Sequence, residues 1–93
     1  MSIHRRNPSR DKNEQIIIDE LRMRGWFVTQ LSGSGVPDLL CGKAGQWVLI
    51  EVKGPTGRLT ASQQVFFDRA AEDNLPVFLC RTAAELQTLL PHP

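Results

Sequence analysis

The chain has 93 residues, of which 41% are hydrophobic and 23% charged, a composition typical of one small folded domain. No apolar run approaches the ~20 residues that a membrane helix requires, and the polar start of the chain lacks the apolar core of a secretory signal. We therefore expect a cytoplasmic protein with no membrane partner, and the net charge of +1 alone does not indicate nucleic-acid binding.

The first segment, residues 1–10, is expected to be a flexible basic arm in front of a single domain over residues 11–91. The arm carries three arginines, Arg5, Arg6 and Arg10. Such a segment can contact phosphate groups, or it can simply be a solvated tail. Composition alone favours the tail.

A helix is predicted over residues 11–24, because its apolar residues recur at helical spacing, and Gly25 follows as a terminator. Asp11 is the expected N-cap, with Glu14 as its partner in a capping box. Glu14 also falls on the apolar stripe of this helix rather than on its polar face. A role in a buried functional site is therefore an equal alternative for Glu14.

Three strands rich in β-branched and aromatic residues are predicted next, over residues 26–31, 38–42 and 47–53. Residues 43–46 join the last two as a hairpin loop. Trp26 and Trp47 are interpreted as core residues. Cys41 and Cys80 lie in apolar runs, which indicates buried, reduced thiols.

The second half of the chain contains two more capping boxes, Thr60 with Gln63 and Thr82 with Glu85, each of which predicts the start of a helix. A strand over residues 76–80 lies between these helices, and the last helix is expected to run to Leu90. The predicted order of elements is α-β-β-β-α-β-α.

The hairpin brings chemistry-bearing residues together if Gly42 faces Trp47 across its loop. In that register Asp38 lies opposite Glu51, and opposed residues point to the same face of a sheet with Cβ atoms ~4.5–5.5 Å apart. Lys53 shares this face because it lies two residues beyond Glu51. The register is an assumption, since a slip of one residue would turn Asp38 to the other face.

Two opposed carboxylates repel each other, and a divalent cation such as Mg²⁺ would compensate that repulsion. Such an ion could polarise a phosphodiester and activate water, while Lys53 orients the water or neutralises developing charge. Asp38 could instead be a turn residue after Pro37, and Glu51 with Lys53 a solvated charged pair. Glu51, however, interrupts an apolar strand, and a charge there needs a reason. The pattern therefore indicates a hydrolytic phosphodiesterase site.

Three segments carry a family resemblance: GVPD at residues 35–38, IEVK at residues 50–53 and LTASQ at residues 59–63. Together they closely resemble the VRR-NUC (virus-type replication-repair nuclease) family of the PD-(D/E)xK superfamily, over residues 14 to about 80. The PD…ExK pattern alone is weak. The G-x-P-D context, the spacing and the following L-T-x-x-Q make the resemblance specific.

The resemblance implies an α/β, restriction-endonuclease-like core of order α-β-β-β-α-β, with a mixed sheet flanked by helices. It implies dependence on Mg²⁺, with Mn²⁺ as a substitute, and no small-molecule cofactor is expected. Asp38 and Glu51 correspond to metal ligands, the backbone carbonyl of Val52 to a further ligand, and Lys53 to the catalytic lysine.

Two helix residues complete the expected catalytic set. Glu14 matches a first-helix glutamate that many superfamily members use near the metal, and Gln63 matches the family's helix glutamine. Each could instead only cap its helix. Gln64 is the weaker candidate of the glutamine pair, because it does not share the apolar face of its helix. Arg58, after the loop that follows Lys53, could contact phosphate.

The expected function is metal-dependent endonuclease activity on DNA, selective for branched structures such as four-way (Holliday) junctions, in a bacterial or phage-infected cell. Stand-alone VRR-NUC proteins are associated with dimers and junction cleavage, and a two-fold axis supplies two sites, so a homodimer is expected. Leu86, Leu89 and Leu90 could serve either its interface or the core. One alternative is a duplex-nicking or restriction-like nuclease. The other is an inactive nucleic-acid-binding module, and the presence of Asp38, Glu51, Lys53 and Gln63 argues against this second alternative.

Overall fold

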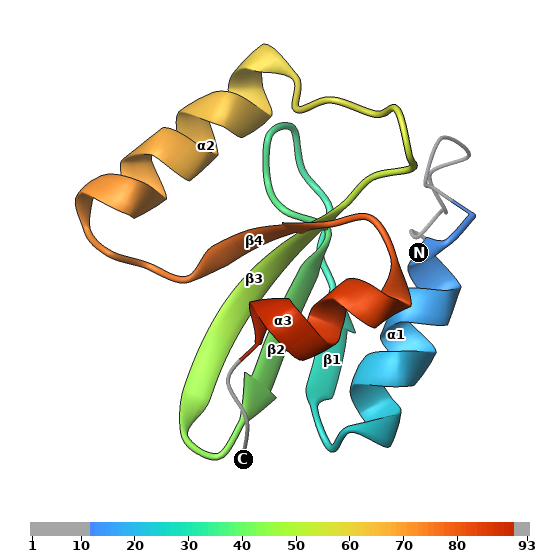
Figure 1. Ribbon diagram of the computed structural model, residues 1–93. Coiled ribbons are helices and arrows are strands. Elements are labelled where there is room, and N and C mark those ends of the chain that lie inside the picture. The colour runs from blue at the N-terminus through green and yellow to red at the C-terminus, as the bar shows by residue number, and fades with distance from the viewer. Residues whose placement is uncertain (1–11, 91–93) are drawn as a thin grey trace, which may run out of the picture.

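The computed structural model describes residues 12–90, which form a four-stranded sheet with helices on both faces (Figure 1). In chain order the elements are α1 (Glu14–Met23), β1 (Phe27–Gln30), β2 (Leu39–Lys43), β3 (Gln46–Val52), α2 (Ala61–Glu72), β4 (Val77–Cys80), the 3₁₀ helix η1 (Ala83–Glu85) and α3 (Leu86–Leu89). This order confirms the expected α/β fold class. The proposed basic arm, residues 1–10, lies outside the described residues.

The strands lie in the order β1-β2-β3-β4, and the sheet is mixed. β2 pairs antiparallel with β1 and with β3, whereas β3 pairs parallel with β4. A parallel pair needs a crossover connection, which α2 supplies. Val52 pairs with Cys80 at the carboxyl ends of β3 and β4, so the segments that follow these strands leave the sheet at the same edge.

The β2–β3 hairpin has the register expected from the sequence. Gly42 pairs with Trp47, and Leu39 pairs with Ile50. The turn is tighter than predicted, because pairing continues to Lys43 and Gln46 and leaves two turn residues, Ala44 and Gly45. Both have positive φ, 51° and 80°, the backbone of a type I′ turn whose twist matches that of paired strands.

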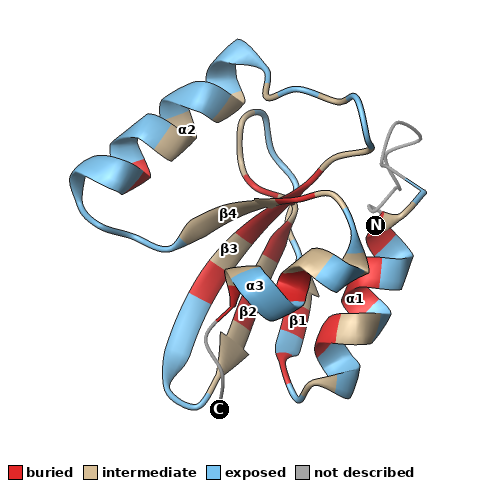
Figure 2. Ribbon diagram, in the orientation of Figure 1, coloured by how far each residue is buried: buried red, intermediate tan, exposed pale blue. Residues whose placement is uncertain are grey.

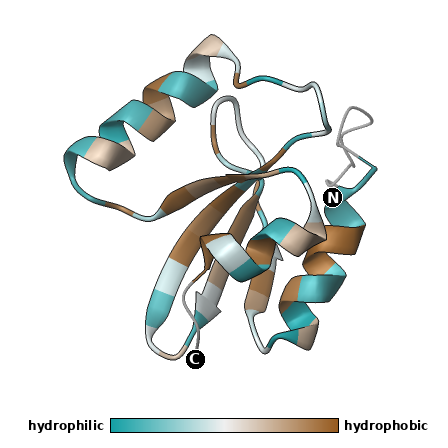
Figure 3. Ribbon diagram, viewed as in Figure 1, coloured by the Kyte–Doolittle hydropathy of each residue, from teal (hydrophilic) through white to brown (hydrophobic). Residues whose placement is uncertain are grey.

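The core lies between one face of the sheet and the helices α1 and α3, as the buried stripes in Figure 2 and the apolar stripes in Figure 3 show. Ile17 and Leu21 of α1 and Leu39 and Ile50 of the sheet have no exposed surface. The core also takes in leucines that the sequence left open between core and interface: Leu86 and Leu90 are buried, and Leu89 packs against them.

Both cysteines are buried in this core and are not joined in a disulfide, as predicted. Burial raises the pKa of the Cys41 thiol to about 12 and that of the Cys80 thiol to about 11. Both thiols therefore stay protonated and chemically inert at neutral pH. Within residues 12–90, no helix is long and apolar enough to cross a membrane.

The predicted capping box at the start of α1 is wrong. The N-cap of α1 is Asn13, so Glu14 is the first residue of the helix and cannot occupy the third position that a capping box requires. Asp11, the expected cap, lies outside the described residues. The boxes of Thr60 with Gln63 and of Thr82 with Glu85 are confirmed, although the second begins η1 rather than a continuous α-helix.

The assignment of Trp47 to the core is also wrong, whereas Trp26 is buried as expected. Trp47 is 57% exposed and meets the ring of Phe27 edge-on, with 6.0 Å between ring centroids. Side chains alternate along β3, so Trp47 lies on the face opposite the buried Val48. Helix α2 lies over that other face and packs on β4, which leaves the Trp47 end of the face open.

Candidate active site

The predicted site lies where β2 begins and β3 ends. Asp38 directly precedes β2, and the last pair of the hairpin, Leu39 with Ile50, brings it close to Glu51. Asp38 Oδ2 accepts a hydrogen bond of 2.9 Å from the Val52 backbone N–H. This bond anchors the Asp38 carboxylate to the end of β3, next to the other residues expected in the site.

Glu51 is a buried carboxylate on a central strand, with only 2% of its surface exposed. Its Oε2 accepts a hydrogen bond of 3.1 Å from Gln63 Nε2 and lies 3.4 Å from Lys53 Nζ. Its Oε1 is buried and has no hydrogen-bond partner. No other buried side-chain oxygen or nitrogen in the described part of the chain lacks a partner.

The environment of Glu51 opposes its ionisation. Burial, followed by the negative charge of Asp38, raises the pKa of Glu51 from 4.5 to about 7, although Lys53 acts in the opposite direction. The amine of Lys53 therefore compensates only part of the repulsion and desolvation. A further positive charge beside Glu51 would favour its ionised form.

Lys53 is held at the edge of the sheet by its backbone. Its N–H donates to the carbonyl of Cys80 at 3.1 Å, which continues the β3–β4 pairing, and its side chain is only 14% exposed. Asn13 Nδ2 donates to the carbonyls of Lys53 and Arg81, at 3.3 and 2.7 Å. The start of α1 is thereby tied to the ends of both parallel strands.

Asn13 was not singled out in the sequence. Its only signal was an asparagine directly before a helical pattern, and Asp11 offered a competing cap. The structure shows that its side chain does not cap α1 but bonds to the strand ends.

Gln63 reaches the site from the first turn of α2, through its bond to Glu51. Gln64, the weaker candidate, instead donates to Asp68 on its own helix, at 2.9 Å. The preference for Gln63 therefore agrees with the geometry.

Glu14 is buried, with 4% of its surface exposed, and accepts a long hydrogen bond of 3.5 Å from Gln30 Nε2. It adjoins Asn13, at the end of α1 nearest the site. Among residues 12–90, no three histidine, cysteine, aspartate or glutamate side chains gather closely enough to hold a metal ion. The structure thus brings Asp38, Glu51, Lys53 and Gln63 together but does not add Glu14 to them as a third carboxylate ligand.

The residues present fit a hard divalent cation. Asp38, directly before β2, and Glu51, on β3, offer neighbouring carboxylate oxygens, and the partnerless Oε1 of Glu51 is the kind of buried acceptor that a cation satisfies. Mg²⁺ prefers oxygen ligands and is commonly held by one or two carboxylates. Val52 lies between Glu51 and Lys53, so its backbone belongs to the same cluster.

A mixed sheet of this order, with two carboxylates and a lysine at the end of its hairpin, defines the PD-(D/E)xK class of nuclease-type folds. Residues 9–84 match the VRR-NUC domain family, and the chain belongs to that family. A solved structure described as a VRR_NUC domain is similar to 85% of this chain and 95% of its own, with a TM-score of 0.70 and 23% identity, and therefore has the same fold. No curated protein matches the sequence.

Proposed function

We propose that this protein is a metal-dependent endonuclease that hydrolyses phosphodiester bonds in DNA, with Mg²⁺ as its cofactor and Mn²⁺ as a substitute. The observation that carries the proposal is the buried Glu51 carboxylate, opposite Asp38 and beside Lys53, with one oxygen left unsatisfied. A purely structural role does not explain two acidic residues at this point, because burying an unsatisfied carboxylate oxygen destabilises the fold.

In this mechanism Asp38 and Glu51 would hold the ion, with the carbonyl of Val52 as a further ligand. Bound there, it would supply Lewis-acid chemistry, polarising the phosphodiester and lowering the pKa of a water molecule. Asp38 is pre-oriented for this role by the Val52 N–H, and Glu51 by the amide of Gln63. These hydrogen bonds limit the reorganisation that ligand binding requires.

Lys53 acts on the reacting groups rather than on the fold. Its ammonium lies 3.4 Å from Glu51 Oε2, at the edge of the carboxylate pair. From there it can orient the attacking water and donate a hydrogen bond to the phosphate oxygen on which negative charge develops. Glu14, in the first turn of α1, has a secondary role in this proposal. It is a nearby acidic residue but not one of the two carboxylates that would hold the ion.

The proposed substrate is branched DNA such as a four-way junction, and the active form a homodimer in the cytoplasm of a bacterial or phage-infected cell. One site cuts one strand, so symmetrical resolution of a junction needs two sites related by a two-fold axis. Leu86 and Leu90 belong to the core, and Leu89 packs against it, so these leucines contribute to the fold rather than forming a separate exposed surface. Among residues 12–90, the exposed large apolar side chains are Ile16, Met23, Phe27, Trp47, Val65 and Leu75.

A cleavage panel tests this proposal directly. The purified chain would be incubated with duplex, single-stranded, flap and four-way junction DNA, in Mg²⁺, Mn²⁺ or EDTA. We expect cleavage of the junction with either metal and none in EDTA. Asp38→Asn, purified in parallel, controls for a contaminating host nuclease.

Four results would count against parts of the proposal. Equal cleavage in EDTA would exclude the metal mechanism, and equal cleavage of linear duplex would exclude junction selectivity. Binding of DNA without cleavage in either metal would indicate an inactive binding module. Light scattering during size-exclusion chromatography tests the homodimer independently, and a strict monomer with DNA present would contradict it.

A further inference from the structure

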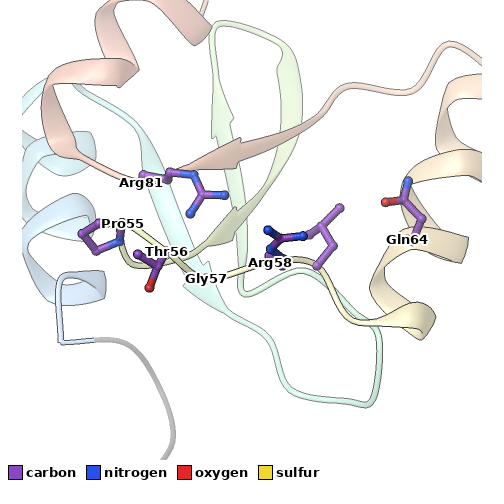
Figure 4. A pocket seen from close by; sticks show the side chains of 7 residues that line it. Pro55, Thr56, Gly57, Arg58, Gln64 and Arg81 are labelled. Carbon is purple, nitrogen blue, oxygen red and sulfur yellow. The ribbon is translucent and has the colours of Figure 1, made fainter.

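A pocket of about 660 Å³ opens beside the segment that follows Lys53. Its lining comes from that segment, from α2 and from the residue after β4, as Figure 4 shows: Pro55, Thr56, Gly57, Arg58, Leu59, Gln64 and Arg81. The mechanism above uses none of these side chains.

The pocket is positively charged. Arg58 and Arg81 both line it, and among residues 12–90 no carboxylate does. Neither arginine forms an ion pair with any acidic residue of the described part of the chain, 12–90, although Arg24 and Arg69 there are both paired. Two guanidinium groups that face one space without a counter-ion attract an anion of matching size.

Residues of the pocket contact residues of the candidate active site. Arg81 Nη1 donates a hydrogen bond to the carbonyl of Gly54, the residue directly after Lys53. Gly57 lies against the stem of the catalytic lysine, since a Cβ atom on Gly57 would come 3.3 Å from Lys53 Cδ. The backbone of Arg81 is fixed in turn by Asn13, which donates to its carbonyl at 2.7 Å. An anion bound in this pocket would therefore lie close to a phosphate group that contacts Lys53.

We propose that this pocket binds a backbone phosphate of the DNA strand, next to the scissile phosphodiester, through Arg58 and Arg81. The inference rests on the proposed function, because it takes a DNA strand as the ligand of the Lys53 site. The lining contains no aromatic side chain on which a base could stack. The contact therefore positions the strand and carries no sequence information.

The test measures DNA binding separately from cleavage. Anisotropy of a fluorescent four-way junction and a linear duplex would be measured in Ca²⁺, which replaces Mg²⁺ to prevent cutting, over a series of salt concentrations. Arg58→Gln and Arg81→Gln should each weaken binding about tenfold. Each lost phosphate contact should also make the slope of log affinity against log salt shallower by roughly 0.7–0.9.

The matched control is Arg24→Gln, which removes the same charge at the opposite end of α1, away from the strand ends that form the site. It should leave the slope unchanged. In cleavage assays with Mg²⁺, the pocket variants should raise KM and leave kcat within about threefold of wild type, because the contact is made before and during the reaction alike.

Arg81 also holds Gly54, so Arg81→Lys is the second variant at that position, with folding of each variant checked by circular dichroism. Lysine keeps the charge, so the slope should stay near that of wild type while affinity falls, because the planar fork is lost. Unchanged slopes in both glutamine variants, or no measurable binding of DNA to wild type, would overturn the subsite. A wild type that binds with an arginine-dependent slope but cuts nothing would instead refute the nuclease function and leave the subsite standing.

Discussion

The side chain of Gln63 joins the start of α2 to the buried carboxylate of Glu51. Its Oε1 accepts a hydrogen bond of 2.8 Å from the Thr60 N–H, and its Nε2 donates to Glu51 Oε2 at 3.1 Å. The two bonds fix the orientation of the amide, since a flipped amide would lose both. Gln63 thus both caps α2 and hydrogen-bonds to Glu51, two roles that the sequence left as alternatives.

Exchange of Gln63 separates these two contributions. Gln63→Glu keeps an acceptor for Thr60 but sets a second carboxylate against Glu51, so we expect cleavage to fall at least tenfold while the helix cap is retained. Gln63→Ala removes both bonds and should also lower the free energy of unfolding by about 1 kcal/mol. Cleavage rates and urea unfolding of both variants test this. Gln15→Ala is the matched control, because Gln15 is exposed and bonds only to Asp19 on its own helix. Wild-type cleavage by Gln63→Glu would contradict the role in the site.

Removal of the Lys53 amine should separate DNA binding from the proposed cleavage reaction. Lys53→Ala is expected to lower kcat by about 10²–10³-fold, because an amine acting on developing charge contributes mainly in the transition state. DNA affinity in Ca²⁺ should stay within about threefold of wild type. Asp38→Asn should instead weaken metal binding, which calorimetric titration with Mn²⁺ would measure. A Lys53→Ala variant that cuts at the wild-type rate would remove Lys53 from the mechanism.

The stability of the metal-free protein should depend on pH through Glu51. The pKa of Glu51 is raised to about 7 in the folded chain from an ordinary 4.5, so the folded state holds the proton more tightly than the unfolded state does. Stability is therefore greatest below pH 4.5 with respect to this group, and it falls as pH rises towards 7. From the size of the pKa shift, we expect a loss on the order of 2 kcal/mol over this range.

Urea unfolding in EDTA between pH 5 and 8 would measure this loss. Glu51→Gln should remove this part of the pH dependence and be more stable than wild type at pH 8, because it has no carboxylate to ionise. Added Mg²⁺ should stabilise wild type at pH 8 and have little effect on Glu51→Gln. Parallel pH profiles for the two proteins would show that Glu51 is not the group responsible.

The exposed Trp47 should limit what can replace Gly42. A Cβ atom on Gly42 would lie 2.8 Å from Cζ3 of the Trp47 ring, which is closer than such atoms approach. We expect Gly42→Ala to destabilise the fold by about 1–2 kcal/mol, because the indole must move. The same substitution in a Trp47→Ala background should have almost no effect, and the double-mutant cycle measures the difference. An equal loss in both backgrounds would exclude the ring contact as the cause.

The hairpin register was predictable because a short turn and strict alternation leave few ways to pair two strands. Those rules sufficed to bring Asp38 opposite Glu51 and to set Lys53 on the same face. The choice of Gln63 over Gln64 followed from the faces of a single helix. All of these are local relationships, within one hairpin or one helical turn.

The residues that sequence reasoning missed depend on distant parts of the chain. Trp47 lies on the same face of β3 as Glu51, but how much of that face α2 covers is decided by the crossover to β4. Asn13 and Arg81 are 68 residues apart and meet only because β3 and β4 end side by side. Nothing in the local sequence around Arg81 distinguishes it from an ordinary surface arginine.

The two-residue turn at Ala44 and Gly45 has a consequence for how this protein can evolve. A single-codon insertion that re-paired the strands one position along would turn Asp38 towards the core and leave Glu51 where it is. Such an insertion would be as damaging as a substitution of Asp38 itself, although it would lie at the other end of the hairpin. The length of this turn is therefore as important to the proposed metal site as the two carboxylates, although the turn residues lie at the far end of the hairpin.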